Sequence, residues 1–345
     1  MALDVDRLRV FREVAACGSF TAAARSLSYT QPAISHHINR LEQELGVTLV
    51  ERSARGLTLT APGEALLAQA DGLLARIDDI ERQVVELAHA GGDVRLIAFP
   101  SAAATLVPHA VAGFRAGFPS AALHLAEADP PQALPELKHG DWDLAVAYDY
   151  PITGEPLDPA LDYETLFFDR MALCLHRYDA RAATRGALSL RDFSRDPWVA
   201  PYDCVCRTAL ELACRQAGFA PEVVSESNDY MAMQGLVAAG VGVALVPRLV
   251  AAMALRPEIV LRPISGSDIT RVVAITTRAG GYTSHAVLGM AAALHEAIAA
   301  IDDPALPLDR ASTHTRPLSD DAPGENGGRP RSRPQAARKS PTRSR

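Results

Sequence analysis

One stretch of the chain carries apolar residues at a spacing that suits a long helix with a partner. Within residues 62–88 they alternate four and three positions apart, at Leu66, Ala70, Leu73, Ile77, Ile80, Val84 and Leu87. This is the heptad spacing of a coiled-coil seam. Such a helix is about 40 Å long, and no helix of equal length is predicted nearby. We therefore expect it to join two domains and to pair with a second subunit; packing on the same chain is the alternative.

The residues before this helix carry start and stop signals for three shorter helices. Gly18 ends a first helix, because glycine readily adopts the left-handed conformation found at helix ends. Ser19 is placed to cap a second helix over 20–27. Thr30 is placed to cap a third, with Pro32 in its first turn. Two helices of this size joined by a short turn form a helix-turn-helix.

The third helix has one buried stripe, formed by Ile34, Ile38, Leu41 and Leu45. Polar side chains occupy its other faces, and those near its start can hydrogen-bond the edges of DNA bases. Capping, or plain solvation, is the alternative role for these residues. The candidate DNA contacts on this helix are Thr30, Gln31, Pro32, Ser35, His36, Asn39 and Arg40.

Two short extended stretches, 48–50 and 57–59, follow the third helix and predict a β-hairpin wing. Arg52 and Arg55 in its loop are candidates to neutralise phosphates or enter a minor groove; an exposed turn is the alternative. His36 and His37 do not predict a metal site, because adjacent helix residues point in different directions and no Cys or carboxylate completes a ligand set.

The segments GSFTAAARSL, YTQPAISHHINRLEQELGVTLVER and GLTLTAPGEALL follow one another nearly without gaps. This ordered run resembles the DNA-binding domain of LysR-type transcription regulators. Further along, FPSAAATLVP and AAGVGVALVP resemble the effector domain of the same family, which is similar to periplasmic binding proteins. The resemblance covers about residues 3–300. Many members carry Lys or Arg near Asn39, so a phosphate contact common in the family is expected to be missing here.

The resemblance implies a sequence-specific regulator that binds an interrupted inverted repeat in double-stranded DNA and is controlled by a small molecule. It also implies a dimer or tetramer paired through the long helix, with RNA polymerase as a further partner.

After the long helix, strands alternate with helices, a pattern that predicts a parallel α/β sheet. The expected elements are a strand at 94–99, a helix at 105–116, a strand at 122–125, a helix at 133–138 and a strand at 144–147. The chain then crosses near 166–168 into a second lobe, with a first strand at 171–175, and returns near 264–269.

The fold class is therefore α/β, with an N-terminal winged helix-turn-helix, a long linker helix and a two-lobed domain like that of periplasmic binding proteins. The expected boundaries are 1–61 for the winged helix, 62–90 for the linker helix, 91–302 for the effector domain and 303–345 for a basic tail without the apolar content to fold. Lobe 1 comprises 91–166 and 268–302, and lobe 2 comprises 167–267.

In such folds ligands bind between lobes, at the carboxyl ends of strands. The candidate effector contacts are Pro100, Ser101, Ala102, Ala128, Asp129, Tyr148, Pro201, Tyr202 and Asp203. Free N–H groups after Ser101 would favour an organic anion, although Asp203 would repel one if it faced the cleft. Shaping a loop is the alternative role for each residue.

Five cysteines, an odd number, favour reduced thiols over a disulfide framework. Cys204, Cys206 and Cys214 nevertheless suggest thiol-based redox sensing as an alternative function, since the peroxide-sensing branch of the family uses a cysteine pair in this lobe. Their spacing does not match that branch, and Cys214 falls on the inner face of a predicted helix, where buried inert thiols are common. Metal sensing through Cys204 and Cys206 would lack a fourth ligand.

Composition and motifs argue against other classes. Apolar residues make up 48% and charged residues 22%, and no apolar run is long enough for a membrane span. The N-terminus lacks the pattern of a secretory signal, so we expect a cytoplasmic protein. No Gly-rich phosphate loop, Gly-x-Ser-x-Gly elbow or HExxH pair occurs, so we expect no enzyme, no catalytic residue and no cofactor. A periplasmic solute-binding protein would need a signal peptide and no DNA module.

The net charge of −7 does not exclude DNA, because its distribution matters more than its sum. Residues 1–60 are nearly balanced and residues 329–345 carry only basic charges. The tail can add nonspecific DNA affinity, and a solvated terminus without function is the alternative.

Overall fold

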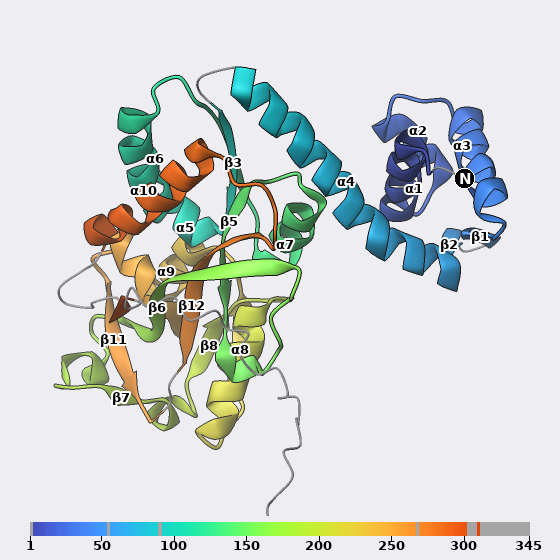
Figure 1. The fold of residues 1–345 in the computed structure, drawn as a ribbon. Helices are drawn as coiled ribbons and strands as arrows, with labels where there is room; N and C mark the ends of the chain where they lie inside the picture. The colour runs from blue at the N-terminus through green and yellow to red at the C-terminus, as the bar shows by residue number, and fades with distance from the viewer. Residues whose placement is uncertain (1–2, 54–55, 89–91, 267–268, 302–308, 311–345) are drawn as a thin grey trace, which may run out of the picture. The chain divides into compact units, whose positions relative to one another are not determined.

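The computed structural model describes residues 3–53, 56–88, 92–266, 269–301 and 309–310, and Figure 1 draws it as a ribbon. None of the helices in those ranges is both long and apolar enough to cross a membrane. The predicted tail lies outside the described residues, apart from the two-residue strand β13 (Asp309–Arg310).

Three helices and a hairpin form the N-terminal part, as predicted. They are α1 (Val5–Cys17), α2 (Phe20–Ser26) and α3 (Gln31–Leu45), followed by the antiparallel strands β1 (Val50–Ser53) and β2 (Gly56–Leu59). Gly18 has φ 58°, and the side chains of Ser19 and Thr30 each accept a backbone N–H in the helix that follows them. Ile34 and Ile38 are fully buried. The capping signals in the sequence therefore set these boundaries.

The linker helix α4 (Ala61–Ala88) is continuous over the predicted length. Its apolar stripe divides into two parts. Ala70 is buried in the core of the winged helix, and Leu66 packs against that core. Leu73, Ile80 and Val84 are 46%, 51% and 62% exposed, with Ile77 half-buried between them. The first part of the predicted seam thus packs on its own chain, whereas the second part is open. The Leu87 side chain lies outside the described residues.

The C-terminal domain contains one long sheet path, β4-β3-β5-β12-β6-β10-β8-β9. In its first half, β3 (Asp93–Ala98) runs parallel to β4 (Ala122–Glu127) and β5 (Leu144–Asp149), and β12 (Thr270–Arg278) is antiparallel to β5. Helices α5 (Pro100–Ala104), α6 (Leu106–Gly117), α7 (Pro130–His139) and α10 (His285–Ile301) belong to this half, and α6 packs against α10 (Figure 1).

The second half of the sheet also has three parallel strands connected by helices. Strand β10 (Val243–Pro247) runs parallel to β8 (Pro197–Ala200), which is parallel to β9 (Glu222–Glu226). Helices α8 (Val205–Gln216) and α9 (Tyr230–Ala238) connect these strands, and β11 (Ile259–Ser265) adds to β6 (Leu161–His176). A short strand β7 (Leu188–Ser189) and the 3-10 helices η1 (Pro151–Thr153), η2 (Ala180–Ala183), η3 (Leu190–Phe193) and η4 (Arg248–Ala252) complete the domain.

Two details differ from the sequence predictions. The crossing between the halves and the first strand of the second half are one continuous strand, β6, which pairs with β12 along its first part and with β10 and β11 along its second. The segment after β3 begins as a separate five-residue helix, α5, because Thr105 breaks the helical path before α6 starts. A helix this short has a weak dipole, so it adds little to the anion preference expected near Ser101.

The linker helix is attached to the C-terminal domain through a buried carboxylate. Asp79 is 2% exposed and pairs with Arg278 at the end of β12, and it also accepts the backbone N–H of Tyr282 at 3.3 Å. His139 and Asp71 lie 3.3 Å apart near the same contact. Polar bonds therefore hold α4 against the first half of the domain.

Candidate functional site

The exposed face of α3 is the candidate DNA-binding surface. Gln31, Pro32, His36, Asn39 and Arg40 are exposed there, opposite the buried stripe, and Ser35 is half-buried. Thr30 is exposed and caps the helix with its hydroxyl. Arg40 lies 3.5 Å from Glu44 on the same helix, a contact that is weak enough for a phosphate to replace. Arg55 lies outside the described residues, and so does the side chain of Arg52.

A small cavity lies where the two halves of the C-terminal domain meet. Its volume is about 30 Å³, and its wall exposes more apolar than polar surface. The first half supplies residues at the ends of β3, β4 and β5, the second half supplies the β8–α8 turn and the start of α9, and β12 supplies Arg271. The lining residues are Phe99, Pro100, Ser101, Asp129, Tyr148, Pro201, Cys204, Cys206, Asn228, Tyr230 and Arg271.

A fully buried ion pair forms one side of this cavity. Arg271 and Asp169 are both 0% exposed and are direct neighbours across the β12–β6 ladder. Nε and Nη2 of Arg271 each lie 2.8 Å from one Asp169 carboxylate oxygen, and Nη2 also donates to Ser101 Oγ at 3.1 Å. The guanidinium lies over the rings of Phe99 and Tyr148, at 4.7 and 5.1 Å. Its remaining nitrogen, Nη1, is buried and has no hydrogen-bond partner among the described residues.

Cys206 and Tyr148 also line the cavity, and Tyr150 lies behind them, outside the lining. The Tyr148 hydroxyl lies 3.3 Å from Cys206 Sγ and 3.1 Å from an Asp129 oxygen, and the Tyr150 hydroxyl lies 3.7 Å from the same sulfur. A hydrogen bond from the Cys204 side chain, opposed by burial and assisted by Tyr148 and the charge of Arg271, lowers the pKa of the Cys206 thiol to about 6. The same hydrogen bond raises the pKa of Cys204. These contacts favour the thiolate form of Cys206.

The structure brings together five of the nine candidate effector residues. Pro100, Ser101, Asp129, Tyr148 and Pro201 line the cavity. The other four do not: Ala102 and Ala128 are buried among apolar neighbours, whereas Tyr202 and Asp203 are exposed. Asp203 has φ 46°, a left-handed conformation that Asp tolerates, and its carboxylate does not line the cavity. The expected repulsion of an anion by Asp203 therefore does not arise there.

Sequence reasoning missed Arg271 as a cavity residue. A charged residue directly before the apolar run Val272–Ile275 was the available signal, but its partner, Asp169, is 102 residues away and depends on the strand register. Of the flagged thiols, Cys204 and Cys206 line the cavity, whereas Cys214 is fully buried in α8 and burial raises its pKa to about 12. Cys214 thus has the surroundings of an inert structural thiol.

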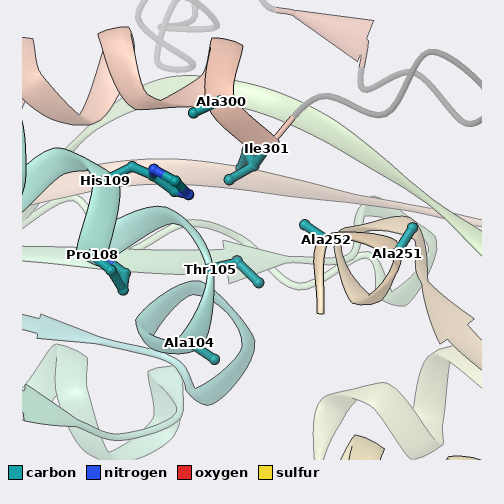
Figure 2. A pocket seen from close by; sticks show the side chains of 8 residues that line it. All are labelled: Ala104, Thr105, Pro108, His109, Ala251, Ala252, Ala300 and Ile301. Carbon is teal, nitrogen blue, oxygen red and sulfur yellow. The ribbon is translucent and has the colours of Figure 1, made fainter. Parts of the chain in front are cut away.

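A second, larger hollow of about 280 Å³ lies elsewhere in the domain (Figure 2). Small side chains of α5, α6, η4 and the end of α10 line it, together with His109. No charged pair or cluster of polar side chains converges on it in the part of the chain described. The smaller cavity, where buried polar groups converge, is the better candidate for a specific ligand.

Comparisons with known proteins agree with this architecture. Residues 5–64 match the family model "Bacterial regulatory helix-turn-helix protein, lysR family", and residues 88–299 match the "LysR substrate binding domain". The chain is 31% identical over 255 residues to the HTH-type transcriptional regulator AlsR of Bacillus subtilis, covering 71% of this chain and 80% of AlsR. It is 33% identical over 258 residues to TfdS of Cupriavidus pinatubonensis, covering 73% and 84%.

Solved structures show the same fold. A full-length OxyR from Pseudomonas aeruginosa aligns with TM-score 0.62 and 23% identity, covering 85% of this chain and 95% of its own. Full-length CbnR in complex with its target DNA aligns with TM-score 0.54 and 22% identity, covering 86% and 100%. With both family models matched in order along one chain, the winged helix-turn-helix, linker helix and two-lobed domain belong to a DNA-binding transcriptional regulator of the LysR family.

Proposed function

We propose that this regulator responds to a small molecule that binds in the cavity between Ser101, Tyr148 and Pro201. The observation that carries this proposal is the free Nη1 of Arg271. A buried guanidinium nitrogen without an acceptor costs free energy, and an oxygen atom of a ligand, from a carboxylate or a carbonyl group, would supply the missing acceptor. Ser101 and Arg271 then hold the same end of the ligand. The proposed effector is therefore not limited to an organic anion, and can be any small molecule with such an oxygen.

We expect Ser101→Trp to abolish the response to inducer. The indole would fill a cavity of about 30 Å³ and displace the Ser101 hydroxyl from Arg271. Calorimetry with wild-type and variant protein, using metabolites of the neighbouring genes, tests this. Ser225→Trp, a change on strand β9 away from the cavity, is the matched control. A ligand that binds wild type and Ser101→Trp equally tightly would remove this site.

The exposed face of α3 is proposed to read base edges, and the wing arginines to contact phosphates. We expect Gln31→Ala and Ser35→Ala to relax base preference, at a cost of about 1–3 kcal/mol for each lost base contact. Arg52→Ala, the comparison variant, is expected to weaken all sites alike and to reduce the salt dependence of binding. Selection from random DNA followed by titration over a range of salt concentrations separates the two effects. Enrichment of no motif would contradict the proposal.

The open part of the linker stripe, Leu73, Ile77, Ile80 and Val84, is proposed to pair subunits as a dimer or tetramer on an interrupted inverted repeat. RNA polymerase is proposed as a partner and the cytoplasm as the location. We propose domain boundaries at 1–61, 62–90, 91–302 and 303–345. Regulation without catalysis is the activity we infer.

A further inference from the structure

We propose that Cys206 is a covalent attachment site for a small α,β-unsaturated aldehyde or ketone that enters the cavity. This inference rests on the proposed effector function and specifies the chemistry of its ligand. Cys206 and Arg271 both line this small cavity, and Nη1 of Arg271 is buried without a hydrogen-bond partner among the described residues. A ligand that satisfies both needs an electrophilic carbon for the sulfur and, a few bonds away, an oxygen for Nη1 of Arg271.

The sulfur has the surroundings of a reactive thiol. It is buried beside two phenol hydroxyls, at 3.3 Å from Tyr148 and 3.7 Å from Tyr150, and Arg271 contributes a positive charge. Tyr148 has one proton to share between Asp129 and this sulfur. When Cys206 is a thiolate, the phenol can donate to the sulfur and stabilise its charge. Within the described ranges Cys174 and Cys214 have no such donors, and burial raises the pKa of each thiol to about 12.

The addition step balances without an oxidant or a metal. The Cys206 thiolate gives an electron pair to the β-carbon of the ligand and forms a carbon–sulfur bond. The π electrons move to the carbonyl oxygen, where Nη1 of Arg271 donates a hydrogen bond to the resulting enolate. A proton from water then adds to the α-carbon and regenerates the carbonyl group. One proton leaves the thiol for the solvent and one proton from the solvent joins the α-carbon, so the proton count balances. The ligand is neither oxidised nor reduced overall.

The proposed adduct favours an organic carbonyl compound over hydrogen peroxide as the ligand. In the adduct the carbonyl oxygen remains against Arg271, so the buried Nη1 keeps its acceptor. Peroxide would transfer one oxygen to sulfur and release water, and the resulting sulfenic acid has no carbon chain to contact the apolar part of the wall. The mostly apolar wall suits a short carbon chain, and the volume of about 30 Å³, room for about two waters, limits the ligand to a few heavy atoms.

The test uses the full-length protein and propenal at pH 6, with propanal as the saturated control. Mass spectrometry of the intact protein and of its peptides follows each cysteine. The lower pKa of Cys206 predicts modification roughly 20-fold faster than that of an ordinary thiol, after allowing for the weaker nucleophilicity of a low-pKa thiolate. Cys17, whose pKa burial and Glu13 raise, is the comparison within the chain. Cys206→Ser is expected to remove the fast adduct, and propanal is expected to form none.

A second variant tests whether the Tyr148 hydroxyl makes Cys206 reactive. Tyr148→Phe keeps the ring and removes one hydroxyl, so it is expected to shift the midpoint of the modification rate upward from about pH 6. Three results would each overturn the proposal. The first is an equal modification rate at all thiols, and the second is an unchanged pH midpoint in Tyr148→Phe. The third is oxidation of Cys206 by hydrogen peroxide that is faster than its modification by propenal. DNA binding is measured on the same samples. A protein that selects a DNA motif yet leaves Cys206 unmodified would overturn the covalent site and leave the proposed function standing.

Discussion

Arg271→Met is expected to lower the free energy of unfolding of the C-terminal domain by about 3–5 kcal/mol, because it leaves the Asp169 carboxylate buried without its cation. Asp169 is fully buried, and burial already raises its pKa against the opposing effect of Arg271. Without the guanidinium the carboxyl group has to take up a proton in order to stay buried. Part of the lost stability should therefore return as the pH falls.

Urea unfolding followed by tryptophan fluorescence measures this change. The chain has two tryptophans, Trp142 and Trp198, and both lie in the C-terminal domain, so the signal reports that domain. The double variant Arg271→Met with Asp169→Leu is the control, because removing both charges is expected to cost much less than removing one. If the single and double variants unfold at the same urea concentration, Arg271 does not compensate the buried Asp169 carboxylate.

Ile80→Asp together with Val84→Asp is expected to convert the assembled protein into monomers. Both side chains are more than half exposed in the single chain, so the changes spare its fold. In a paired helix each new carboxylate would be buried in an apolar seam without a partner, at a cost of at least about 3 kcal/mol, or more than 100-fold in the dissociation constant.

Sedimentation of the two-site variant gives the result directly. Ala65→Asp with Ala68→Asp adds the same charges at exposed positions of the same helix outside the seam, and is expected to leave the assembly intact. An Ile80 and Val84 variant that sediments like wild type would show that subunits pair through another surface.

The sequence predicted the local structure of the winged helix because its signals act over a few residues. Ser19, Thr30 and Gly18 each decide a helix end by bonds or backbone angles within their own neighbourhood. The heptad pattern predicted the linker helix for the same reason. It could not tell which part of the stripe the chain covers itself, since the burial of Ala70 depends on how the winged helix packs against α4.

The cavity was predicted only in part, because its polar groups are joined across the sheet. Strand-end reasoning found Ser101 and Tyr148, whose positions follow from a parallel α/β fold. Arg271 becomes a cavity residue only when β12 takes the register that sets it opposite Asp169. A shift of one residue would turn that side chain to the other face of the sheet. No pattern along the chain specifies this pairing.

Strand β12 carries Arg271 near one end and Arg278 at the other, about 23 Å apart at the usual strand rise. The first arginine faces the cavity and the second holds Asp79 of the linker helix. Between them the strand is bonded to β5 on one side and β6 on the other. The pairing with β6 shifts register once on the way, between Val273 and Ala274. A ligand that displaced Arg271 would therefore act on the same strand that carries Arg278, the residue that holds the linker helix.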